Sequence, residues 1–120
     1  MIIALGKVVS TTPGTPVSLT AAVPALANVL LNQAELVALG GNSGKVYFGD
    51  HTLDKSTLVG CYVGTGLAAN QTLTLQDLQA SQNRGTASFL SGGLGASMNA
   101  NNIYFDVDDT GEGFGGYVTI

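Results

Sequence analysis

The chain has 120 residues and a mass of 12.1 kDa, which is the length of a single domain. Only 10% of the residues are charged, against about 25% in most soluble domains. The net charge is −4, and the four cations are scattered along the chain, at Lys7, Lys45, Lys55 and Arg84. This excludes the clustered basic patch that binds nucleic acid. The single cysteine excludes an intrachain disulfide framework.

Targeting and membrane-spanning patterns are not found in the sequence. The N-terminal segment, residues 1–7, lacks the charged-then-apolar order of a signal peptide. The most apolar region, residues 21–41, is interrupted by polar residues and cannot supply the roughly 20 apolar residues of a membrane span. We therefore expect a soluble protein that is made in the cytoplasm and has no membrane partner.

The first third of the chain predicts strands and one ambiguous segment. Residues 2–10 are rich in β-formers and end at a Thr-Thr-Pro-Gly-Thr-Pro turn, residues 11–16. Residues 17–20 resume the alternation, so we expect them to form a hairpin with residues 2–10. Residues 21–31 leave two interpretations open, because their apolar spacing suits a short helix whereas Pro24 suits a loop.

The central segment predicts a second hairpin. Residues 34–39 and 45–49 are its strands, and a Gly-Gly-Asn-Ser-Gly turn joins them. Val46 and Tyr47 point to opposite faces, so one of the two should be buried. Residues 57–63 predict a further strand.

The last strands complete an all-β pattern. Residues 71–75 alternate strictly, which turns Leu73 and Leu75 inward. Residues 102–107 and 116–120 predict a final hairpin across an Asp-Asp-Thr-Gly-Glu-Gly turn. Short strands separated by turns predict one all-β domain over residues 1–120, an antiparallel β-sandwich or a jelly-roll-like barrel.

One long segment, residues 76–101, departs from this pattern and is predicted to be a loop or arm. It is rich in Gln, Asn, Ser, Gly and Ala, and a loop this long inside a compact domain is usually functional or disordered. We expect it to dock on a neighbouring subunit, with a fold-back across its own domain as the alternative. The residues predicted to dock are Arg84, Phe89, Leu90, Leu94 and Met98.

Two motifs resemble ligand-binding loops only in part. Residues 106–117 place carboxylates, a threonine and a glycine as a calcium loop does, but Tyr117 stands where the bidentate Glu is needed. The segment Gly41-Asn-Ser-Gly-Lys45 has Leu39 and Val46 where a phosphate loop needs Gly and Ser or Thr. We interpret both motifs as turns and predict no metal and no cofactor.

Catalytic groups are sparse. Cys61 lies in an apolar run and is interpreted as a small buried hydrophobe, while His51 is interpreted as a solvated histidine. Asp50 and Asp54 could serve as an acid/base pair, but the chain has no tryptophan to stack a sugar. We expect a protein that is not an enzyme and has no catalytic residues.

Three segments resemble those of small β-rich virion proteins of tailed bacteriophages. They are Gly6-Lys-Val-Val-Ser-Thr-Thr-Pro-Gly-Thr-Pro-Val-Ser-Leu19, Leu39-Gly-Gly-Asn-Ser-Gly-Lys-Val-Tyr-Phe-Gly-Asp50 and Asn102-Ile-Tyr-Phe-Asp-Val-Asp-Asp-Thr-Gly-Glu-Gly113. The resemblance implies a sandwich or jelly-roll module on the capsid, or in a tail or fibre.

Together, the resemblance and the low charge predict a structural role in the virion. A surface poor in charge repels other copies weakly and loses its water at little cost, so an assembly is favoured over a monomer. We expect a capsid decoration (cement) protein that binds the major capsid protein and forms a homotrimer on the capsid surface. The alternative is a head-fibre, tail or baseplate component that attaches to the host.

Overall fold

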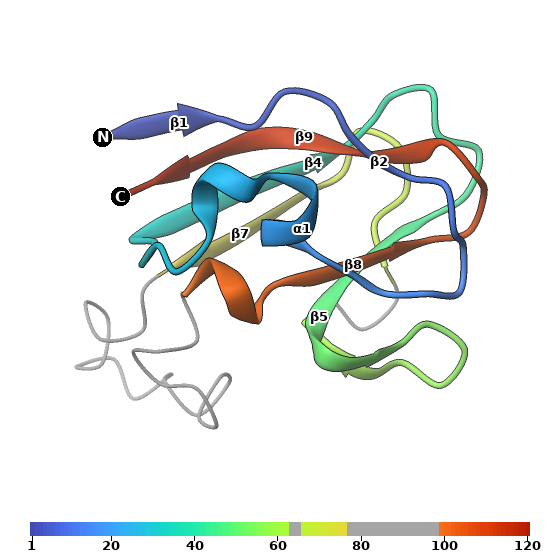
Figure 1. The fold of residues 1–120 in the computed structure, drawn as a ribbon. Coiled ribbons are helices and arrows are strands. Elements are labelled where there is room, and N and C mark those ends of the chain that lie inside the picture. Colours follow the sequence, from blue (N-terminus) through green and yellow to red (C-terminus); the bar gives the residue numbers. More distant parts are fainter. Residues whose placement is uncertain (63–65, 77–98) are drawn as a thin grey trace.

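The computed structural model describes residues 1–62, 66–76 and 99–120, in which two antiparallel β-sheets pack face to face (Figure 1). The predicted all-β sandwich is therefore confirmed. The first sheet consists of β1 (Ile2–Ala4), β2 (Val8–Ser10), β4 (Gln33–Ala38), β7 (Thr72–Gln76) and β9 (Glu112–Thr119). The second sheet consists of β3 (Val17–Ser18), β5 (Val46–Asp54), β6 (Val59–Cys61) and β8 (Tyr104–Val107).

Strand β9 is the centre of the first sheet. It pairs with β1 and β2 along one side and with β4 along the other, and β4 in turn pairs with β7. Glycines permit this close packing: a Cβ at Gly113 would overlap the carbonyl oxygen of Val8, and one at Gly116 would overlap that of Glu35. Gly116 also has a φ of +127°, which side chains rarely allow.

The core lies between the two sheets and follows from the alternation of the strands. Phe114 on β9 packs edge-to-face against Phe48 on β5 and Phe105 on β8, with ring centroids 4.8 and 4.9 Å apart. All three rings are fully buried, so they join the two layers. On β7, Leu75 is buried and Leu73 half-buried, while the intervening threonines are exposed, which confirms the predicted orientation.

Short helices cover part of the core. The four-residue α1 (Leu19–Ala22) begins at Ser18, whose hydroxyl accepts a hydrogen bond from the amide of Ala21 at 3.1 Å. The 3-10 helix η1 (Pro24–Leu26) follows directly, with Pro24 in its first turn, where the missing N–H is harmless. Leu19 of α1 and Leu26 of η1 are both fully buried. The ambiguous segment therefore forms short helical turns.

The three predicted hairpins are wrong. Each turn was placed correctly, but the strands on its two sides belong to different sheets. In the first predicted hairpin, β2 pairs with β9 and β3 pairs with β8. In the second, β4 lies in the first sheet and β5 in the second. In the third, β8 lies in the second sheet and β9 in the first. Turn residues specify where the chain reverses, but in a sandwich the reversal can equally carry it across the core.

The outer face of the second sheet is also partly covered, and here a second prediction fails. Tyr47 faces away from Val46, yet both are buried, with 9% and 0% of their surface exposed. Tyr47 lies opposite Asp106 in the β5–β8 register, and Asp106 is buried as well. This face is covered by neighbouring segments of the same chain, including Leu53 against Gly49.

The predicted arm, residues 76–101, falls mostly outside the described residues. Gln76 is the last residue of β7, and the described chain resumes at Asn99, whose side chain caps the 3-10 helix η5 (Ala100–Asn102). The predicted docking residues Arg84, Phe89, Leu90, Leu94 and Met98 all lie within the segment 77–98, outside the part that the structure describes.

Candidate functional site

Two loops that are far apart in sequence meet at one end of the sandwich. The glycine-rich loop, residues 39–45, connects β4 to β5, and the acidic turn, residues 108–111, connects β8 to β9. Because both loops cross between the two sheets, they emerge side by side. Glu112, the first residue of β9, accepts hydrogen bonds from the amides of Ser43 at 2.6 Å and Gly44 at 3.0 Å. The Ser43 hydroxyl donates a third bond to Glu112 at 3.0 Å.

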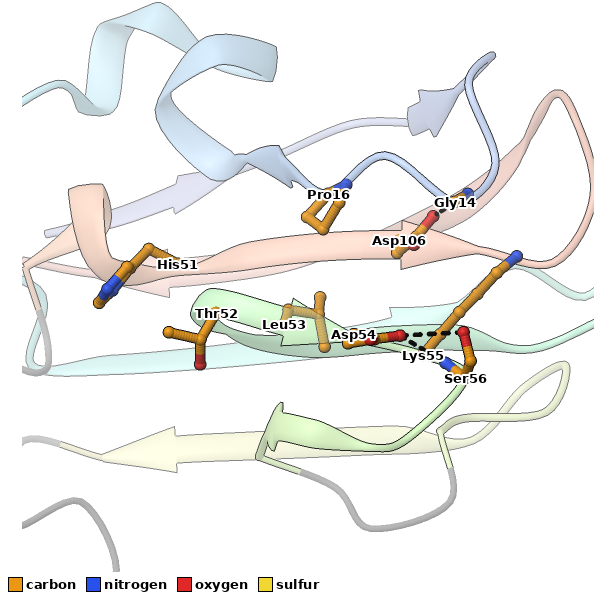
Figure 2. Close-up of a pocket in the computed structure, with 9 residues that line it drawn as sticks. All are labelled: Gly14, Pro16, His51, Thr52, Leu53, Asp54, Lys55, Ser56 and Asp106. Atoms are coloured by element: carbon orange, nitrogen blue, oxygen red, sulfur yellow. Dashed lines mark hydrogen bonds between the residues drawn. The ribbon is translucent and has the colours of Figure 1, made fainter.

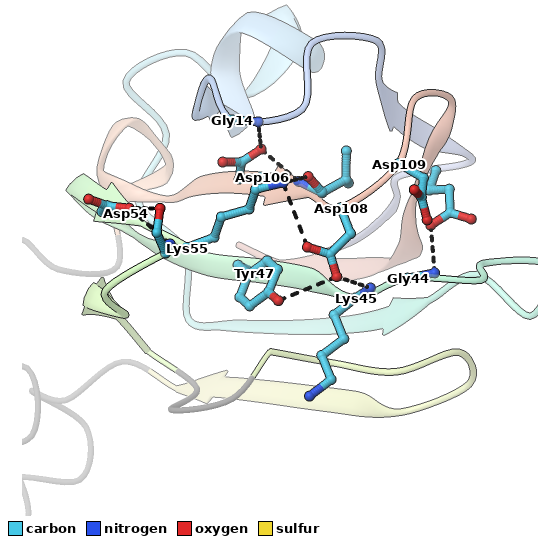
Figure 3. A network of polar contacts seen from close by, with 12 residues as sticks. Gly14, Gly44, Lys45, Tyr47, Asp54, Lys55, Asp106, Asp108 and Asp109 are labelled. Carbon is cyan, nitrogen blue, oxygen red and sulfur yellow. Dashed lines mark hydrogen bonds and ion pairs between the residues drawn. The ribbon is translucent and has the colours of Figure 1, made fainter.

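The aspartates of the acidic turn extend this network (Figure 3). Asp108 Oδ2 accepts from the Lys45 amide at 2.9 Å and from the Tyr47 hydroxyl at 3.4 Å. Its Oδ1 lies 3.6 Å from Lys55 Nζ. The Ser43 hydroxyl is also 3.0 Å from Asp109 Oδ2. The acidic turn is thus held by the backbone of the glycine-rich loop.

This arrangement explains both partial motifs. Successive backbone amides of a glycine-rich loop attract an anion, and here the anions are carboxylates of the same chain. Hydrogen bonds from the Ser43 amide, and then from Gly44, hold the pKa of Glu112 below its usual value. Burial, followed by the charge of Asp108, raises the pKa of the Tyr47 hydroxyl. The network fixes the geometry of two loops, and the sequence interpretation of both as turns agrees with it.

Among the residues described, no group of three or more His, Cys, Asp and Glu side chains is arranged to hold a metal ion. The carboxylates of the acidic segment diverge: Asp106 turns toward Gly14, whereas Asp108 and Glu112 turn toward the glycine-rich loop.

The candidate binding site is a pocket on the outer face of the second sheet, with a volume of about 440 Å³. One wall is the loop that leads into β3, and the other is the end of β5 with the turn that follows it (Figure 2). The residues that line it are Gly14, Pro16, His51, Thr52, Leu53, Asp54, Lys55, Ser56 and Asp106.

Asp106 is the deepest polar group of this pocket. Only 1% of its surface is exposed, and its Oδ1 accepts hydrogen bonds from the amides of Gly14 at 2.9 Å and Val107 at 2.8 Å. On the opposite wall, Asp54 Oδ1 accepts from the amide and the hydroxyl of Ser56, both at 2.9 Å. The hydrogen bond from the Ser56 amide, followed by the one from its hydroxyl, lowers the pKa of Asp54.

The reactive residues weighed in the sequence lie on the neighbouring strands β5 and β6. His51 is exposed on β5, as predicted for a solvated histidine, although it lies within a strand. Cys61 is half-buried, less than expected, and burial followed by the charges of Asp50 and Asp54 raises the pKa of its thiol. Burial raises the pKa of the neighbouring Tyr62 to about 12, and its hydroxyl donates to the carbonyl of Asn102 at 3.0 Å.

The pocket was not predicted from the sequence. Asp106 was considered only as a calcium-loop ligand, because its place opposite Tyr47 depends on the β5–β8 pairing, which was not predicted. The sequence carried no signal for it: Asp106 stands between Phe105 and Val107 in a strand, and alternation places a carboxylate flanked by core positions on the outer face, which in an antiparallel sheet is commonly solvated.

Comparisons with known proteins identify no relative: no protein-family model, curated protein or solved structure matches this chain. No helix among the described residues is long and apolar enough to cross a membrane.

Proposed function

We propose that this chain is a non-enzymatic structural protein of a bacteriophage virion, a decoration (cement) protein on the capsid surface. In this role it binds the major capsid protein, associates with itself as a homotrimer and stabilises the head. The proposal rests on the resemblance of three segments to phage virion proteins and on the properties of the molecular surface.

The observation that carries the proposal is that the described carboxylates accept hydrogen bonds from within the chain. The chain has eight acidic residues, and every one that the structure describes accepts a hydrogen bond from the chain itself. These residues are Glu35, Asp50, Asp54, Asp106, Asp108, Asp109 and Glu112. A carboxylate oxygen that already accepts a hydrogen bond has less need of water, so a surface that holds few other charges is desolvated cheaply when it meets a partner.

Exposed apolar side chains add to this surface. At the side of the first sheet, Ile2 on β1 and Val9 on β2 are 70% and 38% exposed. On the β5–β6 turn and β6, Leu58 and Val59 are 39% and 56% exposed. Apolar side chains on outer strands favour association with another chain, which supports self-association or docking on a shell.

The mechanism of stabilisation would be the bridging of neighbouring subunits. A specific interface buries about 1,600 Å², and a trimer that contacts several capsid subunits at once gains effective affinity without any single strong contact. Each bridge adds buried area that must be lost before the shell can open.

The test is binding of the purified chain to capsids of its own phage that lack it. We expect saturable binding over the whole head surface and slower loss of packaged DNA on heating. The double variant Ile2→Lys/Val9→Lys should bind at least about tenfold more weakly, because two charges would have to be desolvated. The matched control Thr11→Lys/Thr110→Lys adds the same charge at other exposed positions and should bind as the wild type does.

Two results would refute the proposal. A chain that stays monomeric and does not bind capsids is not a decoration protein. Binding confined to the tail or its fibres would instead support the alternative role in a tail, baseplate or head fibre.

A further inference from the structure

The pocket between the loop before β3 and the end of β5 has the size of a ligand site. Its volume of about 440 Å³ lies within the range of small-molecule pockets, roughly 300 to 1,000 Å³. Figure 2 shows Pro16 and Gly14 on one side, Leu53, Asp54 and Lys55 on the other, and Asp106 between them. The proposed virion role does not use this pocket.

The carboxylate of Asp106 is only half satisfied. Both of its hydrogen bonds are made to Oδ1, from the amides of Gly14 and Val107. In the described part of the chain, Oδ2 accepts no hydrogen bond. A residue with 1% of its surface exposed loses most of its hydration. A hydrogen-bond donor at Oδ2 would therefore stabilise the carboxylate of Asp106, and a cationic donor would stabilise it most.

The nearest cation of the chain is engaged elsewhere. Lys55 lines the pocket, but its Nζ donates to the carbonyl oxygen of Val107 at 2.6 Å and pairs with Asp108 Oδ1 at 3.6 Å. Asp54 adds a second carboxylate to the wall. The pocket therefore presents two carboxylates, the exposed Asp54 and the buried Asp106. Its lysine, Lys55, pairs with Asp108 instead.

The walls are suited to a slender apolar stem. Pro16 and the buried Leu53 face the pocket from opposite sides. A chain of methylene groups can pack between such surfaces while its polar end reaches further.

We propose that this pocket binds an alkylammonium or guanidinium group, with the stem between Pro16 and Leu53 and the cationic head on Asp106 Oδ2. The head donates a charge-assisted hydrogen bond to Asp106 and is attracted by Asp54. A lysine or arginine side chain of a partner protein has this chemistry, and so does a free polyamine. A neutral sugar could donate a hydroxyl to Oδ2 but would leave the buried charge uncompensated.

The test is a titration of the ¹⁵N-labelled full chain, followed by NMR. The probes are Nα-acetyl-lysine methylamide, Nα-acetyl-arginine methylamide and the polyamine spermidine. Nα-acetyl-norleucine methylamide is the matched control, because it keeps the stem and lacks the ammonium group, and methyl glucoside tests the sugar. We expect saturable shifts of the Gly14, Leu53 and Val107 amides with cations, and at least about tenfold weaker binding of norleucine.

Three isosteric variants locate the cation. Asp106→Asn keeps the Oδ1 acceptor and should weaken cation binding at least about tenfold. Asp54→Asn changes an exposed residue and should weaken it by about twofold to fivefold. The control Asp109→Asn removes a carboxylate outside the pocket and should leave binding unchanged. If Asp106→Asn does not fold, Asp54→Asn and the norleucine comparison still decide the question.

The outcomes separate the possible ligands. Tighter binding of the acetylated amino acids than of spermidine indicates a protein side chain, and the reverse indicates a free polyamine. Equal binding of norleucine and lysine derivatives, saturable binding of methyl glucoside alone, or no saturable shift at the three amides with any cation would overturn the proposal.

Discussion

Glu112 accepts three hydrogen bonds from the glycine-rich loop. It accepts two amide hydrogen bonds and one hydroxyl hydrogen bond from Ser43 and Gly44. The loop has no regular structure of its own, so these bonds replace the pairing that its backbone would have in a strand. This carboxylate therefore contributes three of the hydrogen bonds that hold the crossing between β4 and β5 against the start of β9, beside those of Asp108 and Asp109.

Replacing the Glu112 carboxylate should make the stability of the fold less dependent on pH in the acid range. Because the folded-state pKa of Glu112 lies below its ordinary value of 4.5, the ionised form stabilises the fold above that value, and this contribution disappears as the pH falls through the folded-state pKa. Glu112→Gln should therefore lower the melting temperature at about pH 7, with the difference from the wild type shrinking as the pH falls below 4.5. Thermal unfolding across this range measures it.

The matched control is Glu35→Gln. Glu35 accepts one bond, from the Tyr117 hydroxyl at 2.7 Å, and no amide of the glycine-rich loop. Its replacement should lower the melting temperature less than Glu112→Gln does at about pH 7. An equal loss in the two variants, or a Glu112→Gln deficit that persists in acid, would show that the loop does not depend on this carboxylate.

Strand β9 shows how the glycines act at the level of an element. It pairs with β1, β2 and β4, and Gly113 lies so close to the backbone of β2 that no side chain fits. The other glycines of the chain do not all have this role, since a Cβ at Gly41 would meet nothing within 4 Å.

Alanine at these two glycines should therefore give opposite results. Gly113→Ala should lower the free energy of unfolding by roughly 3 kcal/mol, because β2 must move away from β9. Gly41→Ala should change it by less than about 0.5 kcal/mol. Urea unfolding measures both, and similar values for the two variants would contradict the close pairing of β2 with β9.

The contact between the layers depends on the aromatic cluster. Phe114→Ala should lower the free energy of unfolding by about 4 kcal/mol, since it opens a cavity between the sheets. Phe114→Leu retains most of the volume and should cost about 1.5 kcal/mol. The exposed Ile2→Ala is the control and should cost less than about 0.5 kcal/mol. A loss for Phe114→Ala no larger than that of the control would show that the ring does not join the layers.

The faces of individual strands were predictable from the sequence, whereas the pairing of the strands was not. Alternation predicted the buried and exposed faces of β7, because the side-chain period of a strand is a local property. The pairing of strands is not local: the turn after Leu39 looked like a hairpin turn, but β4 and β5 enter different sheets. The loop-to-loop network followed from these crossings, so neither it nor the Asp106 pocket could be predicted before the topology was known.

At the scale of the whole molecule, the surface is what connects structure to function. The described carboxylates are engaged within the chain, and apolar side chains such as Ile2 and Val59 remain exposed on outer strands. Such a surface favours burial in an assembly. At concentrations where self-association is complete, sedimentation should show a species of three 12.1 kDa chains; a single 12.1 kDa species under all conditions would contradict the proposed homotrimer.

The most direct test of the proposed role is electron cryomicroscopy of purified particles of the phage that carries this chain. The two-sheet domain should appear in many copies arrayed over the whole outer surface of the head, in contact with the major capsid protein. A particle without it, or one that holds a small fixed number of copies at the tail, would contradict the decoration role.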